Sequence, residues 1–166
     1  MILPSFFPFP KAQIFTLQTL PDRLQQPTAV LTSDRGDEDL LTRYAQQYPG
    51  QLIVQEVWKE LLPDAPLLIS SAICGGEVRD RFAFAAKERS CWLLIEPMRH
   101  KFPLPCPDAK GEALTSLPEN TGFFSQTLCC RYTHFPGFVL LWDTEETLAQ
   151  KLQLAKEAGF LGYVVP

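Results

Sequence analysis

The chain has 166 residues, of which 46% are hydrophobic and 20% are charged, and its formal net charge is −4 at pH 7. This length and apolar content suit one domain with a sizeable core, so we expect a single α/β domain over residues 1–166. The acidic balance and the lack of a Lys and Arg cluster argue against binding nucleic acid through its phosphates. No run reaches the roughly 20 apolar residues of a membrane-spanning helix.

The amino terminus and the cysteines favour a reducing compartment. The opening stretch MILPSFFPFP contains three prolines and no preceding basic residue, unlike a signal peptide. The five cysteines include no C-x-x-C pair, and only two histidines accompany them, so we expect no metal site and no cofactor. We therefore predict a soluble cytoplasmic protein whose cysteines act as small buried hydrophobic residues.

Strands and helices alternate through the first part of the chain. Apolar and β-branched runs predict strands at 11–20, 28–33, 51–58, 67–73 and 91–97. Apolar spacing with charges opposite indicates helices over 34–48 and 77–90. This alternation favours a mostly parallel sheet with right-handed β-α-β crossovers.

The second part of the chain does not continue this alternation of strands and helices. Residues 98–126 are rich in proline and show no sustained periodicity, which predicts a long irregular loop. A β-hairpin follows near 127–143. Thr144 is a suitable N-cap for a helix that ends at Gly159, and the last strand covers 160–166.

Residues 127–165 resemble the closing section of family 18 glycoside hydrolases and the related spore-germination proteins. In that family a hairpin ending in an acidic residue precedes a helix of the type KLQLAKEAGF and a strand beginning GYVV, as in this chain. The resemblance implies a (β/α)-barrel-like fold with Asp143 near the substrate cleft. A complete eightfold barrel takes about 250 residues, so the barrel would be shortened here.

The hydrolytic motif of that family, D-x-x-D-x-D-x-E, is only partly matched by DRGDEDLL at 34–41. Leu41 stands where the family has the acid that protonates the leaving oxygen, and a hydrocarbon cannot do so. We therefore expect no hydrolysis and interpret Asp34, Asp37 and Asp39 as charges at a helix start.

Candidate ligand-binding residues follow the strands, because ligands of parallel α/β sheets meet residues beyond the carboxyl ends of the strands. Glu96 ends an apolar strand, and Arg99 and His100 follow within four residues. This set could bind an anionic or hydroxylated ligand or move a proton. The alternative is that a Glu96–Arg99 ion pair ties down the proline-rich loop.

Two further strand ends carry polar or aromatic groups. Ser70 and Ser71 end one strand. Trp142 and Asp143 combine an aromatic platform with a hydrogen-bonding acid, as sugar sites do. The alternative is that Trp142 belongs to the core and Asp143 caps the following helix.

Three functions remain open from the sequence. The first is a non-hydrolytic, barrel-like domain that binds a small polar ligand, a sugar or an anion, at the rim that carries Glu96. The second is an enzyme with Glu96 or His100 as acid or base and 98–126 as a lid. The third is an interaction module in which MILPSFFPF and Phe123–Phe124 dock a partner or a second copy of the chain.

Overall fold

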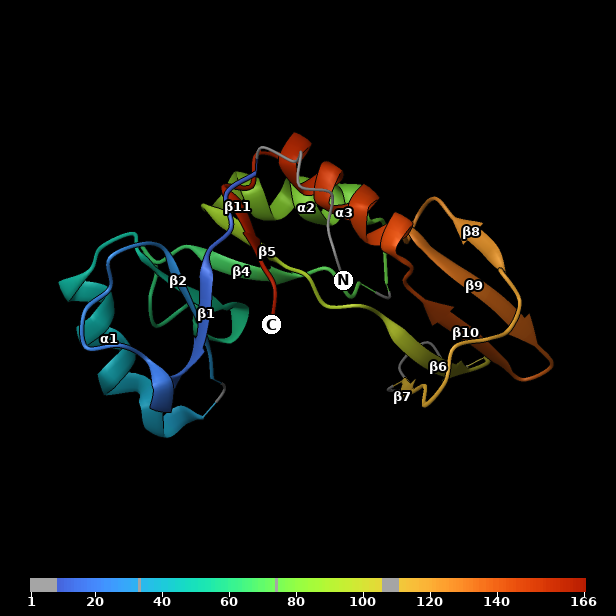
Figure 1. The fold of residues 1–166 in the computed structure, drawn as a ribbon, viewed down its shortest axis with the longest axis horizontal. Coiled ribbons are helices and arrows are strands. Elements are labelled where there is room, and N and C mark those ends of the chain that lie inside the picture. The colour runs from blue at the N-terminus through green and yellow to red at the C-terminus, as the bar shows by residue number, and fades with distance from the viewer. Residues whose placement is uncertain (1–8, 33, 74, 106–110) are drawn as a thin grey trace.

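The computed structural model of the protein describes residues 9–32, 34–73, 75–105 and 111–166. Within these ranges the fold is α/β, as expected, with a parallel sheet, an antiparallel sheet and α-helices (Figure 1). The parallel sheet consists of β1 (Gln13–Thr16), β2 (Thr28–Leu31), β3 (Leu52–Gln55), β4 (Leu67–Ser70), β5 (Cys91–Leu94) and β11 (Gly162–Val164). Its spatial order is β1-β2-β3-β4-β5-β11, and every neighbouring pair is parallel, which confirms the predicted sheet.

The parallel sheet curls into a half-barrel, and the residues just before β1 reach β11. Lys11 and Tyr163 form a parallel bridge, in which the Ala12 N–H donates to the Tyr163 carbonyl at 2.9 Å and the Tyr163 N–H donates to the Pro10 carbonyl at 2.9 Å. The inner face of the curl is a small apolar layer of Ala12, Ala29, Ile53, Leu68, Trp92, Leu94 and Val164. These residues alternate along each strand with outward-facing ones, as the two-residue period of a strand requires.

Gly162 explains how the last strand fits against this inner layer. A Cβ at this position would collide with the ring of Trp92 and with the carbonyl oxygen of Pro10. Trp92 is 5% exposed, so its ring fills the inside of the curl beside the glycine. The close approach of β11 to the start of the chain therefore needs a residue without a side chain.

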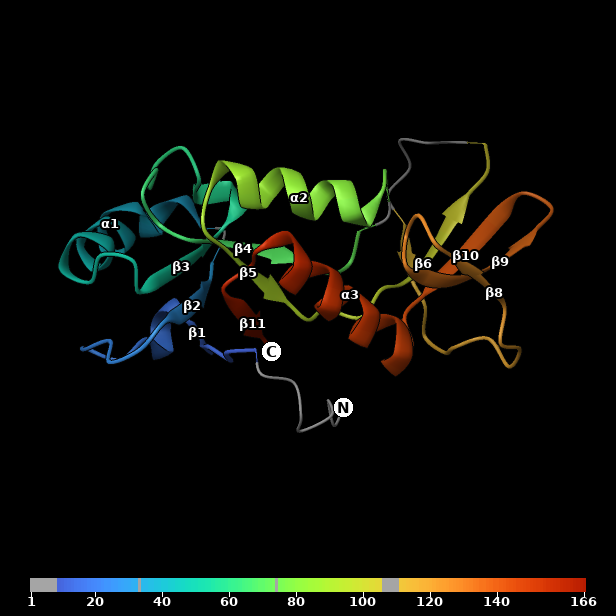
Figure 2. The same cartoon turned by 90° about the horizontal axis from the view of Figure 1, so that it is seen from above.

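Helices cover the outer face of the curled sheet. The α-helices are α1 (Glu38–Gln47), α2 (Val78–Glu88) and α3 (Glu145–Ala158). Helices α2 and α3 lie side by side over β4, β5 and β11 (Figure 2). The main core lies beneath them, and the rings of Phe82 and Phe160 pack there with centroids 5.1 Å apart.

The ends of α3 agree with the sequence. The Thr144 hydroxyl accepts a hydrogen bond from the Thr147 N–H at 3.3 Å, and Gly159 ends the helix in the left-handed conformation at φ 97°. Both features are typical helix-end devices, which is why this helix could be delimited from sequence.

The antiparallel sheet is inserted between β5 and α3. It consists of β6 (Arg99–Pro103), β7 (Glu112–Ala113), β8 (Phe123–Ser125), β9 (Cys130–Phe135) and β10 (Phe138–Trp142), in the order β7-β6-β10-β9-β8. The predicted hairpin is β9–β10. The segment 98–126 is not a purely irregular loop, because β6, β7 and β8 lie in it. In Figure 1 this sheet extends to one side, beyond the carboxyl end of β5.

No helix among the described residues has the length and apolar character to cross a membrane.

Candidate functional site

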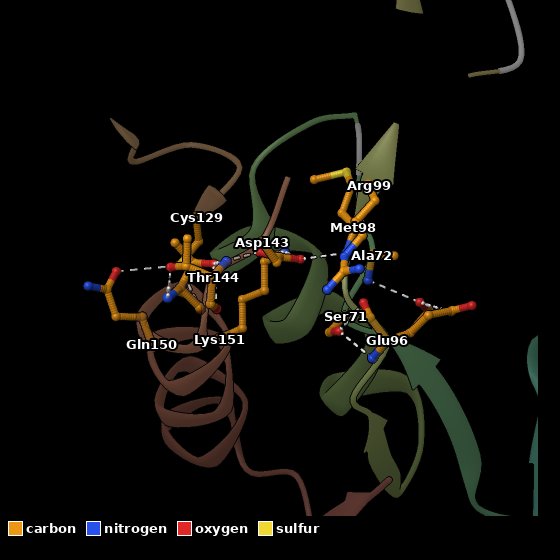
Figure 3. Close-up of polar contacts among 12 residues, drawn as sticks. Ser71, Ala72, Glu96, Met98, Arg99, Cys129, Asp143, Thr144, Gln150 and Lys151 are labelled. Carbon is orange, nitrogen blue, oxygen red and sulfur yellow. Dashed lines mark hydrogen bonds and ion pairs between the residues drawn. The ribbon is translucent and has the colours of Figure 1, made fainter. Parts of the chain in front are cut away.

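Glu96 lies directly beyond β5, at the carboxyl edge of the curled sheet, and its side chain is held by the neighbouring strand. The Ser70 hydroxyl donates to Glu96 Oε2 at 2.7 Å and accepts from the Ala72 N–H at 3.0 Å. The hydroxyl of Ser71 donates to the Glu96 carbonyl at 2.9 Å and accepts from the Glu96 N–H at 2.9 Å (Figure 3). Two consecutive serines at the end of β4 thus fix both the backbone and the carboxylate of Glu96.

The Glu96 carboxylate remains open to solvent on its other side. Glu96 is exposed, and within the described ranges its Oε1 atom has no hydrogen-bond partner. Among the described residues neither Glu96 nor Arg99 takes part in an ion pair. The carboxylate is therefore an oriented acceptor with one oxygen available to a ligand.

Arg99 and His100 begin β6, and they point to opposite faces of the antiparallel sheet because successive strand residues alternate. Arg99 lies opposite Trp142 of β10, and His100 lies opposite Leu141. The His100 ring packs on Phe102 at a centroid distance of 5.9 Å, and its Nδ1 accepts from the Arg99 N–H at 3.3 Å. The two side chains that are adjacent in sequence therefore face opposite sides of the sheet.

Trp142 is 3% exposed and so resembles a core residue rather than an open platform. Gly122, at φ 57°, lies so close to it that a Cβ there would collide with the Trp142 ring. A cavity of about 440 Å³ is nevertheless lined by Trp142 together with Arg131 and Glu146, whose charged groups are 3.6 Å apart. The indole therefore offers little surface to a ligand in this cavity.

Asp143 forms a buried ion pair with Lys151. Lys151 Nζ lies 2.9 Å and 2.8 Å from the two carboxylate oxygens, and both side chains are 0% exposed (Figure 3). The Asp143 carboxylate also accepts from the Met98 N–H at 2.9 Å and from the Thr147 hydroxyl at 2.7 Å. Asp143 contacts Met98, which is two residues beyond Glu96, so the two acids lie at the same end of the fold. The hydrogen bonds of the Asp143 carboxylate, however, are made to groups of the protein itself.

This pair connects the two sheets. Met98 precedes β6, Asp143 follows β10, and Lys151 belongs to α3, which covers the parallel sheet. The Asp143 N–H also donates to the Met98 carbonyl at 2.8 Å. We therefore assign Asp143 a positioning role at the base of the antiparallel sheet.

Lys151 was not singled out in the sequence, although a signal was present. Asp143, Thr147 and Lys151 are spaced by four residues, which places them in one row at the start of the helix, and Lys151 interrupts the apolar stripe of Leu148 and Leu152. A lysine in an otherwise buried stripe needs an acid close by, and Asp143 supplies it.

Cys129 is the second residue that was not identified as special. It has φ 49°, a left-handed conformation that is unusual for a residue other than glycine. Its Sγ lies 3.7 Å from the Thr147 carbonyl oxygen and 3.6 Å from Gln150 Oε1. Burial raises the pKa of the Cys129 thiol above its ordinary value, with Lys151 acting in the opposite direction, so the thiol is protonated at neutral pH and is a poor nucleophile.

The interaction patch expected at the amino terminus is only partly described. Phe6 and Phe7 lie outside the described residues, whereas Phe9 is buried and packs against Tyr163 with ring centroids 6.1 Å apart. Phe123 is 62% exposed and Phe124 is 39% exposed, so these two aromatic rings are available at the surface.

Three or more His, Cys, Asp or Glu side chains that could hold a metal ion do not come together anywhere in the described part of the chain. In comparisons with known proteins, the chain matches no protein-family model, no curated protein and no solved structure. The resemblance to family 18 glycoside hydrolases stays a prediction from the sequence.

Proposed function

We propose that this protein binds a small hydroxylated ligand, such as a sugar, at the carboxyl edge of its curled sheet, without hydrolysing it. The observation that carries the proposal is the exposed Glu96 carboxylate, of which Ser70 holds one oxygen at 2.7 Å while the other has no hydrogen-bond partner among the described residues. An acceptor that is already oriented loses little conformational entropy when a ligand hydroxyl donates to it.

The sign of the charge favours a hydroxylated ligand over an anion. A carboxylate accepts hydrogen bonds and repels another anion, and no cation within the described ranges pairs with Glu96 to offset this repulsion. A hydrogen bond to a charged group contributes about 1.5–3 kcal/mol, which corresponds to roughly a 10-fold to 100-fold change in Kd.

Binding is better supported than acid–base catalysis. Glycoside hydrolysis generally uses two carboxylates on either side of the scissile bond. Asp143, the acid at the same end of the fold, is buried against Lys151 and is not free to act as the second carboxylate. His100 and Arg99 lie on opposite faces of the antiparallel sheet. This arrangement leaves Glu96 as a single positioned acceptor.

The test is isothermal titration calorimetry with a panel of neutral monosaccharides and disaccharides. We expect Glu96→Gln to weaken binding about 10-fold to 100-fold and Ser70→Ala to weaken it less, because the carboxylate then remains but is free to rotate. Glu88→Gln, which changes an exposed acid at the end of α2, is the matched control and should bind as the unmodified protein does.

Two outcomes would remove the proposal: no binding to any sugar in the panel, or a Kd that Glu96→Gln leaves unchanged while circular dichroism shows an intact fold. Turnover of the sugar in the same mixtures, detected by NMR of the products, would favour the enzyme alternative instead.

A further inference from the structure

A groove of about 540 Å³ lies away from Glu96, between the start of α2, the β8–β9 turn and the outer side of α3. Its lining includes Glu77 and Arg79 of the α2 start, Phe124 and Gln126 of the β8 region, and Gln150 and Gln153 of α3. The volume falls within the range of about 300–1,000 Å³ that small-ligand sites occupy. None of these residues belongs to the rim at Glu96.

The three walls of the groove are tied to one another. The Val78 N–H at the start of α2 donates to the Thr127 carbonyl of the turn at 2.9 Å. On the other side of the turn, Cys129 Sγ lies 3.7 Å from the Thr147 carbonyl of α3. The groove is therefore a fixed feature of the packing between these elements.

Within the described part of the chain, the polar side chains of the groove keep both donors and acceptors that make no hydrogen bond. Gln150 Oε1 accepts from the Cys129 thiol at 3.6 Å, which leaves the amide nitrogen of Gln150 to donate elsewhere. Gln153 Nε2 donates to Glu157 Oε1 at 2.9 Å, which leaves the Gln153 carbonyl oxygen and the second Glu157 oxygen as acceptors. A hydroxyl group, which both donates and accepts, matches this mixed set.

An aromatic ring completes the groove. Phe124 is 39% exposed, and the Arg131 guanidinium carbon lies 5.9 Å from its ring centroid, directly opposite in the β8–β9 pair. The lining carries the acids Glu77 and Glu157 and the cation Arg79, and Arg131 adds a second cation beside Phe124. These charges balance, so the groove has no net charge to attract an ion and suits a neutral ligand.

We propose that this groove is a second binding site, for a neutral hydroxylated ligand with one apolar face, such as a pyranose. The apolar C–H face of the ligand lies on Phe124, and its hydroxyls exchange hydrogen bonds with Gln150 and Gln153. Aromatic stacking opposite carboxamides is the chemistry that distinguishes such a ligand from an anion or a purely apolar molecule.

The experiment titrates the full chain with methyl β-D-glucopyranoside, methyl α-D-mannopyranoside and, as an anionic probe, glucuronate, followed by two-dimensional ¹H–¹⁵N NMR. The side-chain amide signals of Gln150 and Gln153 should shift with a neutral glycoside and not with glucuronate. Phe124→Ala should weaken this binding at least 10-fold. Phe123→Ala is the matched control, because it removes the adjacent ring on the opposite face of β8 and should change the Kd less than twofold.

A second variant tests the hydrogen-bond assignment. Gln150→Glu keeps an acceptor for the Cys129 thiol but removes the free NH₂ donors, so it should weaken binding at least fivefold with the fold retained. Glu96→Gln should leave the groove signals shifting as before, which separates this site from the rim. The inference is overturned if neither glutamine amide shifts at 50-fold excess of either glycoside, or if Phe123→Ala and Phe124→Ala have equal effects.

Discussion

Replacing Lys151 by methionine would remove the ammonium group, keep an unbranched side chain, and leave the Asp143 carboxylate fully buried without its cation. Breaking a buried ion pair by removing one partner costs about 3–5 kcal/mol. In Lys151→Met the carboxylate still accepts from the Met98 N–H at 2.9 Å and from the Thr147 hydroxyl at 2.7 Å, so we expect the lower end, about 3 kcal/mol. Asp143→Ala would leave both the buried Lys151 ammonium and the Met98 N–H without an acceptor, and should cost about 5 kcal/mol.

Urea denaturation at pH 7, followed by circular dichroism, measures these differences in the free energy of unfolding. For a chain of this size, 3 kcal/mol corresponds to a fall in Tm of roughly 6–12 °C. Lys87→Met, at an exposed position near the end of α2, is the control and should change stability by less than about 1 kcal/mol. The reasoning would be refuted if Lys151→Met stayed within 1 kcal/mol of the parent. It would also be refuted if the double variant Asp143→Ala/Lys151→Met were as destabilised as the sum of the two single variants, because a coupled pair is non-additive.

Three further expectations follow from single positions. Burial raises the pKa of the Cys91 thiol from 9.0 to about 11, so the thiol loses its proton at a lower pH in the unfolded chain than in the folded one. The free energy of unfolding should therefore fall as the pH rises from 9 towards 11. Urea titrations at pH 7.5 and 10.5 measure this fall, which should be smaller in Cys91→Ala. Gly162→Ala should lower Tm, because the added Cβ would collide with the Trp92 ring and a backbone carbonyl. Overpacking of this kind typically costs about 1–3 kcal/mol. An unchanged Tm would show that β11 is not so closely packed. Thr144→Ala should cost about 1 kcal/mol through the lost α3 cap, whereas Thr144→Ser, which keeps the hydroxyl, should cost less; equal losses in urea would argue against the cap.

The parallel sheet was readable from the sequence because its central strands, β3, β4 and β5, are buried on both faces. In β5 all four residues, Cys91–Leu94, are buried, so they form a continuous apolar run between punctuating residues. The α3 helix was equally clear from Thr144 and Gly159, which act locally. The curl agrees with the barrel-like fold that the resemblance implied, but the bridge between Lys11 and Tyr163 was not predicted, because it joins residues from the two ends of the chain.

The antiparallel sheet was harder to foresee because β6, β7 and β8 are short and have no fully buried residue. β6 (Arg99–Pro103) has only exposed or half-buried residues, so no apolar alternation marks it, and its pairing with β10 depends on residues about forty positions away. The same strand decides the candidate site: once Arg99 and His100 are strand residues, they must face opposite ways.

The residues of the candidate site were thus partly predictable. Glu96 was identified from its place at a strand end, and Ser70 and Ser71 were noted at the neighbouring end, but their hydrogen bonds to Glu96 require the register of β4 against β5. Asp143 was identified from the same rule, whereas its burial depends on Lys151, a residue that sequence spacing alone did not assign to it.

The most direct measurement of the central claim is chemical-shift mapping at the rim. Titrating ¹⁵N-labelled protein with the tightest-binding neutral sugar of the panel should shift the backbone amides of Ala72 and Glu96, whose N–H groups donate to the hydroxyls of Ser70 and Ser71. In Glu96→Gln the same shifts should need about 10-fold to 100-fold more sugar. Saturating sugar that leaves both amides unmoved would contradict the account.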